Sequence, residues 1–182
     1  MQESRFIRYN AFMTGNGHRI TTFAILMAAT GSLPASLLAL LGSVFPDRVE
    51  KFLWGPPNRH HRRTSHWFVL YLSGFCLCFY LWGDATLPTL QLLPESLADC
   101  FWPAVFSCVA FWFLGGLLHI LGDAFCGKVP LFNPFKKTFG WKFFRMSKAH
   151  GEMSRDEAIF VGFVALSCLC AWLRRYGLVG AI

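Results

Sequence analysis

The stretch GGLLHILGDAF, residues 115–125, carries a histidine and a carboxylate four residues apart in an otherwise apolar segment. Residues at i and i+4 of a helix lie on one face, so His119 and Asp123 are expected to point the same way. Neutral imidazole and carboxylate are good ligands for zinc and similar divalent ions. Ionisable groups in a segment apolar enough for a membrane cost free energy, and a bound cation would offset that cost. The spacing therefore favours a metal site at the end of this segment.

The composition is typical of a polytopic membrane protein. Of the 182 residues, 54% are hydrophobic and only 15% are charged, whereas about a quarter of the residues of a soluble domain are charged. Mean hydropathy is +0.42 and the net charge is +7. In a membrane protein, basic charge favours anionic lipid headgroups or a phosphate-bearing substrate. We therefore expect membrane lipids as partners and no nucleic acid; the sequence does not indicate an oligomeric state.

Apolar blocks with helix-start signals predict an all-α fold, a polytopic membrane helical bundle in one membrane-embedded domain over residues 1–182. We expect a broken helical hairpin over residues 20–45. Further membrane helices, about three, are expected over residues 65–82, 101–123 and 157–175. Thr64 and Ser65 are candidate N-caps of the first of these helices, and Ser154 with Glu157 forms a capping-box pattern before the last.

The first block is interrupted by Thr-Gly-Ser-Leu-Pro at residues 30–34, a combination that breaks apolar helices. Each half has about eleven residues, or about 17 Å of helix, and cannot cross a core of roughly 30 Å alone. Two arrangements remain open: one kinked spanning helix, or a hairpin that enters and returns. We prefer the hairpin because it puts the basic residues on both flanks of the block on one side.

The basic residues divide unevenly between the two sides of this topology. The N-terminal segment has three, the loop after the first block five, and the segment after residue 123 seven, so fifteen of the 17 Lys and Arg share one side. The positive-inside rule makes that side cytoplasmic. Arg174 and Arg175 fall on the other side. Residues 130–144 mix Phe, Trp and Lys and are expected either to lie on the headgroups or to pack as a loop on the bundle.

The same topology brings several polar residues to one face of the membrane. The helices over 65–82 and 101–123 share a short loop and so run antiparallel, which places His66 beside His119 and Asp123. A hairpin at residues 20–45 adds the residues that flank it, His18 and Asp47. This set exceeds one tetrahedral site and would suit two ions that share a carboxylate. The candidate metal ligands are His18, Asp47, His61, His66, His119 and Asp123.

These motifs resemble, in order and rough spacing over residues 17–134, those of the YdjM-like family, bacterial inner-membrane proteins assigned as metal-dependent hydrolases. His61 to His66 resembles the family's H-R-x-x-T-H motif, with Ser65 in place of Thr. Gly17-His18 and His119-x-x-x-Asp123 resemble two others. Pro46-Asp47 resembles Pro-Asp-x-Asp-His, although Val49 and Glu50 replace its second Asp and its His.

That family is similar in turn to zinc-dependent phospholipase C and to fungal zinc nucleases. The resemblance implies that Asp47, His66, His119 and Asp123 bind one metal and that His18 joins Asp123 on a second. The cofactor would be one or two divalent ions, zinc before others.

An enzyme of this kind would use a metal-activated water to hydrolyse a phosphodiester or ester of a lipid or a membrane-proximal molecule. Asp47 or Glu50 would accept the proton, and Arg62 or Arg63 would stabilise charge on the phosphoryl oxygens. A non-catalytic scaffold stabilised by metal, or a regulatory protein, is the alternative. A transporter is less favoured because the ionisable residues cluster at the ends of the apolar blocks.

Overall fold

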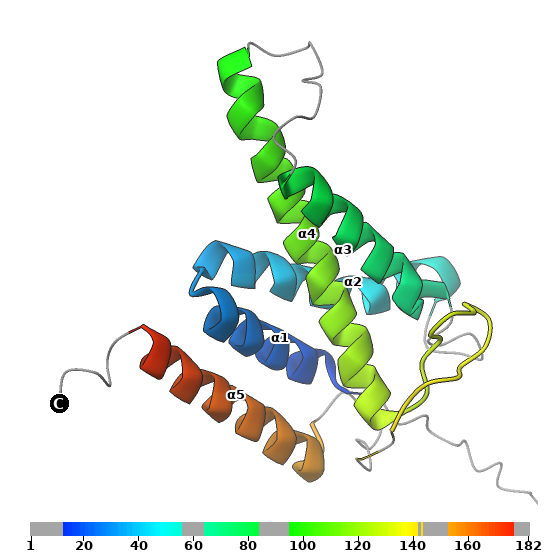
Figure 1. Ribbon diagram of the computed structural model, residues 1–182. Coiled ribbons are helices and arrows are strands. Elements are labelled where there is room, and N and C mark those ends of the chain that lie inside the picture. Colours follow the sequence, from blue (N-terminus) through cyan, green and yellow to red (C-terminus); the bar gives the residue numbers. More distant parts are fainter. Residues whose placement is uncertain (1–12, 56–63, 84–94, 142, 144–152, 177–182) are drawn as a thin grey trace, which may run out of the picture.

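The computed structural model describes residues 13–55, 64–83, 95–141, 143 and 153–176, and within them the fold is all-helical (Figure 1). In chain order the elements are α1 (Gly15–Thr30), α2 (Leu33–Trp54), the short 3₁₀-helix η1 (Thr64–His66), α3 (Phe68–Gly83), α4 (Glu95–Cys126) and α5 (Arg155–Arg175). The predicted all-α class is confirmed. The grouping of residues 1–182 in one domain stays a prediction.

Two of these helices are long and apolar enough to cross a membrane, in α4 over Phe101–Cys126 and in α5 over Arg155–Arg175. The prediction of about three such helices besides the hairpin was too high. The difference is α3, whose 16 residues extend about 24 Å, less than a hydrocarbon core of roughly 30 Å.

The break in the first apolar block separates two helices that lie side by side, α1 and α2 (Figure 1). Thr14 caps the start of α1, and Gly31 ends it with φ 66°, a left-handed conformation that suits glycine. Ser32 then caps α2, with a proline in its first turn. The helical hairpin is therefore present, but it reaches from residue 15 to residue 54 rather than 20 to 45, because α2 continues through Pro46 for two more turns.

Helix α4 is the centre of the fold, with α2 and α3 packed along it (Figure 1). The contact between α2 and α4 is backbone against backbone. A Cβ atom at Gly42 would overlap the carbonyl of Trp112, and one at Gly115 would overlap the carbonyl of Ala39. Small residues at such a crossing let helices approach closely, the usual way in which helices pack without a hydrophobic driving force.

The buried apolar cluster lies between α3 and the C-terminal half of α4. Its fully buried members are Tyr71, Leu117, Ile120, Ala124 and Val129. Ile120 and Ala124 each follow one of the candidate ligands of α4 in the chain. The packing of this cluster therefore fixes the rotation of α4 and the direction in which His119 and Asp123 point.

Helix α5 lies at the edge of the bundle and packs against α1 (Figure 1). Only 11% of its apolar window is buried inside the protein. Figure 1 also shows α1 and α5 running in the same direction, so both helices begin at the same end of the molecule.

We predict that Gly115→Val destabilises the fold by about 3 kcal/mol or more, because its side chain must displace the backbone of α2. Thermal unfolding of the protein in detergent measures the change. Gly162→Val is the matched control, since a Cβ at this helical glycine of α5 meets no atom within 4 Å. Equal melting temperatures for the two variants would contradict the close α2–α4 crossing.

Candidate metal centre

Four side chains from three elements converge on one point at the C-terminal end of α4. His66 Nε2 lies 3.1 Å from His119 Nε2 and 3.3 Å from Asp47 Oδ1. Asp123 Oδ2 lies 3.5 Å from His66 Nε2 and 3.8 Å from His119 Nε2. The distance from His119 Nε2 to Asp47 Oδ1 is 3.6 Å. All of these atoms are of the kinds that bind divalent metals.

The spacing of these atoms fits a tetrahedral metal site. Zinc binds nitrogen and carboxylate oxygen at about 2.0–2.2 Å, and a tetrahedron of that radius has edges of about 3.3–3.5 Å. The five edges given above run from 3.1 to 3.8 Å. In addition, two imidazole Nε2 atoms 3.1 Å apart need a proton or a cation between them. The residues present therefore fit a divalent ion, and Asp47, His66 and His119 form one group that can hold it.

Ser65 and Glu50 contact Nδ1 of His66, the ring nitrogen that faces away from the ligand cluster, and so orient the ring. Glu50 Oε2 lies 3.3 Å from His66 Nδ1 and accepts a 3.0 Å hydrogen bond from the Ser65 hydroxyl. A carboxylate on Nδ1 holds the proton there and makes Nε2 the nitrogen that binds a metal. Glu50, predicted as a proton acceptor in the reaction, thus lies on the far side of the imidazole from the ligand cluster, where it supports a ligand.

A second group of possible ligands shares Asp123 with the first. Asp123 Oδ1 lies 3.2 Å from His18 Nε2 and accepts a hydrogen bond of 3.2 Å from the backbone N–H of Met13. The rings of His18 and His119 stack with centroids 3.7 Å apart. His18, His119 and Asp123 form the second group that can hold an ion. The two oxygens of Asp123 therefore face two neighbouring sites, as expected for a bridging carboxylate.

Exposure differs sharply among the ligands. The side chains of His18, His66, His119 and Asp123 are at most 3% exposed, whereas the Asp47 side chain is 41% exposed. Solvent therefore reaches the cluster from the side of Asp47, where α2 borders it.

The carboxylates and imidazoles of the cluster favour each other's charged forms even without an ion. Burial alone would lower the pKa of His66, but its hydrogen bonds to Asp47 and Glu50 and the charge of Asp123 outweigh burial and raise it. Burial alone would raise the pKa of Asp47. The charges of His119 and His66, and the hydrogen bonds from these two histidines, outweigh the effect of burial and hold the pKa of Asp47 well below its usual range. The arrangement thus favours positive charge at the point where the four ligand atoms meet.

One supporting contact was not predicted from the sequence. Glu157, at the start of α5 and 1% exposed, accepts hydrogen bonds from the Thr14 backbone N–H at 2.6 Å and from the Thr14 hydroxyl at 2.7 Å. This contact holds Thr14 in place. Thr14 lies between Met13, whose backbone N–H bonds Asp123, and α1, which carries His18. Ser154 and Glu157 match a capping box, and that local signal gives no indication of a partner 143 residues away.

A loop after α4 covers the same end of the molecule. The backbone N–H of Trp141 bonds the carbonyl of Ala124, and Val129 pairs with Phe139 in an isolated β-bridge. The Trp67 indole donates to the carbonyl of Phe132. The side chains of Phe132 and Phe135 are 76% and 68% exposed. The segment is thus packed on α4 and next to His66, with aromatic side chains left on its outer surface.

His61 and Arg62 lie outside the residues that the structure describes, so their predicted roles stay predictions. The other predicted ligands, His18, Asp47, His66, His119 and Asp123, lie in the cluster.

The fold and site together define a class: a helical membrane protein with a buried cluster of His and Asp that can hold a metal ion. The chain belongs to the YdjM inner membrane protein family, whose model matches residues 13–179. No curated protein and no solved structure matches it, and the similarity to phospholipase C therefore remains an expectation from sequence motifs.

We predict that the protein purified under metal-replete conditions carries at least one divalent ion per chain and that His119→Ala and Asp123→Ala lose it. Each variant removes a ligand that both candidate groups contain or border. Inductively coupled plasma mass spectrometry measures the content. Asp156→Ala, which removes an exposed carboxylate at the start of α5, is the control and should keep its metal. Metal content equal to wild type in both ligand variants would rule out the site.

Glu50→Gln is expected to retain the metal but to weaken its affinity by about 10- to 100-fold, the usual effect of removing a carboxylate behind a ligating histidine. Competition with a chromophoric chelator measures the affinity. Because Gln keeps an oxygen that can accept from Ser65, the fold should be preserved and the melting temperature of the metal-free protein little changed. An affinity equal to wild type would show that Glu50 does not act through His66.

Proposed function

We propose that this chain is a membrane-embedded, metal-dependent hydrolase that cleaves a phosphodiester or ester of a lipid or a membrane-proximal molecule. The observation that carries the proposal is the difference in exposure within the cluster. A structural metal site is closed, whereas a catalytic site keeps a position open for water or substrate. His66, His119 and Asp123 are buried, and the Asp47 side chain alone borders solvent, so we propose that water takes the fourth position on the ion with Asp47 beside it.

A divalent ion bound here would lower the pKa of a bound water toward neutrality and supply a hydroxide nucleophile. Asp47 is the one partly exposed carboxylate of the cluster and faces both imidazoles through Oδ1, and in this proposal it accepts the proton of the water instead of binding the ion. Glu50 and Ser65 keep the His66 ring in the metal-binding tautomer. Arg62, four residues before His66 in the chain, is proposed to stabilise charge on the phosphoryl oxygens.

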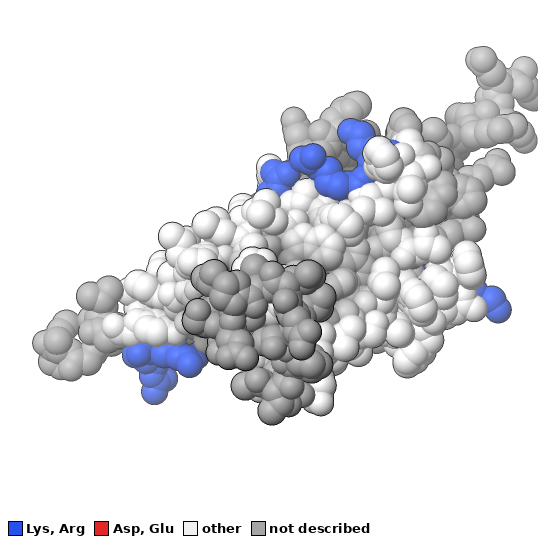
Figure 2. Space-filling model, turned by 90° about the horizontal axis from the view of Figure 1, so that it is seen from above, with Lys and Arg blue, Asp and Glu red and all other residues white. Residues whose placement is uncertain are grey.

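The position of the cluster supports a substrate at the membrane surface. Four of the five ligands come from the first turn of α1, from η1 before α3 and from the last turns of α4, and so lie at one end of these helices, where Asp47 of α2 joins them. On the face drawn in Figure 2, the described charged side chains are Lys and Arg, in separate groups around a broad uncharged surface. Such a surface suits a bilayer with basic groups at its edges, and by the positive-inside rule we propose that the site lies at the cytoplasmic face of a multi-pass protein.

Hydrolysis is tested with purified protein loaded with zinc in phosphatidylglycerol vesicles, together with bis(p-nitrophenyl) phosphate and p-nitrophenyl acetate as soluble probes. We predict turnover of at least one probe and a loss of about 10²- to 10⁴-fold in kcat for Asp47→Asn, the range expected when a proton acceptor is removed. Asp156→Asn, which alters an exposed carboxylate of α5, is the matched control and should keep full activity. Equal rates for metal-loaded wild type and His119→Ala on all three probes would refute the proposal.

A metal-stabilised scaffold is the second candidate, and the deep burial of His18, His66 and Asp123 favours it. In that case the metal is retained, no probe is cleaved, and chelation lowers the melting temperature sharply, because unpaired carboxylates and histidines are left buried.

A further inference from the structure

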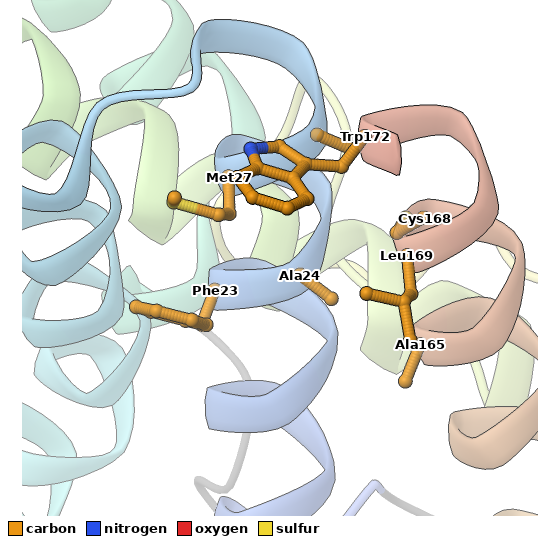
Figure 3. Close-up of a pocket in the computed structure, with 8 residues that line it drawn as sticks. Phe23, Ala24, Met27, Ala165, Cys168, Leu169 and Trp172 are labelled. Carbon is orange, nitrogen blue, oxygen red and sulfur yellow. The ribbon is translucent and has the colours of Figure 1, made fainter. Parts of the chain in front are cut away.

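An apolar cavity lies between α1 and α5, away from the ligand cluster (Figure 3). Its volume is about 290 Å³, and its lining consists of four residues of α1 between Phe23 and Ala28 and four residues of α5 between Ala165 and Trp172. None of these eight residues carries a charge. Figure 3 shows the Trp172 ring beside Met27 at one end of the cavity, with Phe23 and Ala165 toward the other.

The cavity opens toward the surroundings of the protein because α5 is an edge helix, only 11% buried over its apolar window. Leu169, in the lining, is 50% exposed. In an inner membrane protein the medium outside this groove is hydrocarbon, which leaves lipid chains as the available filling.

The dimensions of the groove suit an acyl chain. An engineered apolar cavity of about 150 Å³ holds one benzene ring, so about 290 Å³ accommodates roughly a dozen carbon atoms. The lining begins five residues after His18 and ends ten residues after it, or about 7 to 15 Å along the axis of α1. That offset is comparable to the separation between the headgroup of a phospholipid and the middle of its acyl chains.

Basic groups stand at the end of the groove nearer to the metal centre. Arg19 lies in the second turn of α1 and bonds the side chain of exposed Asn16, and Arg155 is exposed at the start of α5. Since α5 and α4 contact different sides of α1, the groove runs beside the metal centre rather than through it. Gly15 and Asn16, in the first turn of α1 close to the ligand His18, are exposed at this end of the groove.

We propose that the groove between α1 and α5 binds one acyl chain of an anionic phospholipid, and that this lipid is the substrate class of the metal centre. Arg19 and Arg155 contact its phosphate, and the side chains from Phe23 to Trp172 contact its chain. The proposal that an acyl chain binds here is based on the groove itself, and only the role of the lipid as substrate rests on the proposed function.

The test uses full-length, metal-loaded protein in phosphatidylethanolamine vesicles that contain a phosphatidylglycerol with a photoactivatable diazirine near the middle of one acyl chain. After illumination, mass spectrometry maps the labelled peptides. We expect labels concentrated on the cavity residues of α1 and α5. In Ala165→Trp, labelling there should fall to about a tenth or less, because the indole fills the cavity. The control is Leu166→Trp, which adds the same ring at a neighbouring position of α5 that is 61% exposed and does not line the cavity.

Labelling spread evenly over the exposed apolar residues and equal in Ala165→Trp and wild type would mean bulk lipid only, and would overturn the proposal. Retained metal content shows that Ala165→Trp is folded, and Ala24→Leu, a smaller filling of the same cavity, should lower labelling to an intermediate level. His119→Ala separates the two proposals, because it should keep the labelling pattern. Labelling confined to the groove without cleavage of the lipid by wild type would refute the lipid as substrate and leave the binding site standing.

Discussion

The carboxylate of Asp123 is the interaction on which the site depends. One of its oxygens accepts from Met13 and faces His18, and the other faces His66 and His119. Residues from the start of α1, from η1 and from the end of α4 thus meet on one buried anion. Burying a carboxylate costs several kcal/mol unless it is compensated by charge and hydrogen bonds. The segment that begins α1 therefore supplies a backbone donor and an imidazole to this carboxylate, and η1 supplies a second imidazole.

The parts of this arrangement that sequence could predict are those fixed by local spacing and by chain direction. His119 and Asp123 share a helix face because they are four residues apart. His66 lies beside them because a short connection makes α3 and α4 antiparallel. The glycine at position 31 ends α1 in a left-handed conformation, so α2 returns and brings Asp47 to the same end as His18. Each step needs only one element or one turn.

Other features depend on packing between residues far apart in the chain, which no local pattern specifies. Glu50 lies behind His66 because α2 continues beyond Pro46. A proline in an apolar run usually indicates the end of a helix, so this extension was not predicted. The bond of Glu157 to Thr14 joins segments 143 residues apart. The number of spans was overestimated because residues 64–66 form a separate 3₁₀-helix, so that α3 begins only at Phe68 and is too short to cross the core.

The close crossing of α2 and α4 connects these features. Because Gly42 and Gly115 let the two backbones touch, Asp47 is carried to the end of α4, and its carboxylate can reach the imidazoles there. A larger separation would leave His66, His119 and Asp123 as three buried ligands without the exposed fourth. Helix α1 then fills the space between α2 and α5, with His18 pointing to Asp123 and the apolar groove on its other side. A single constraint, two glycines in contact with two carbonyls, therefore determines both how the cluster closes and from which side it can be reached.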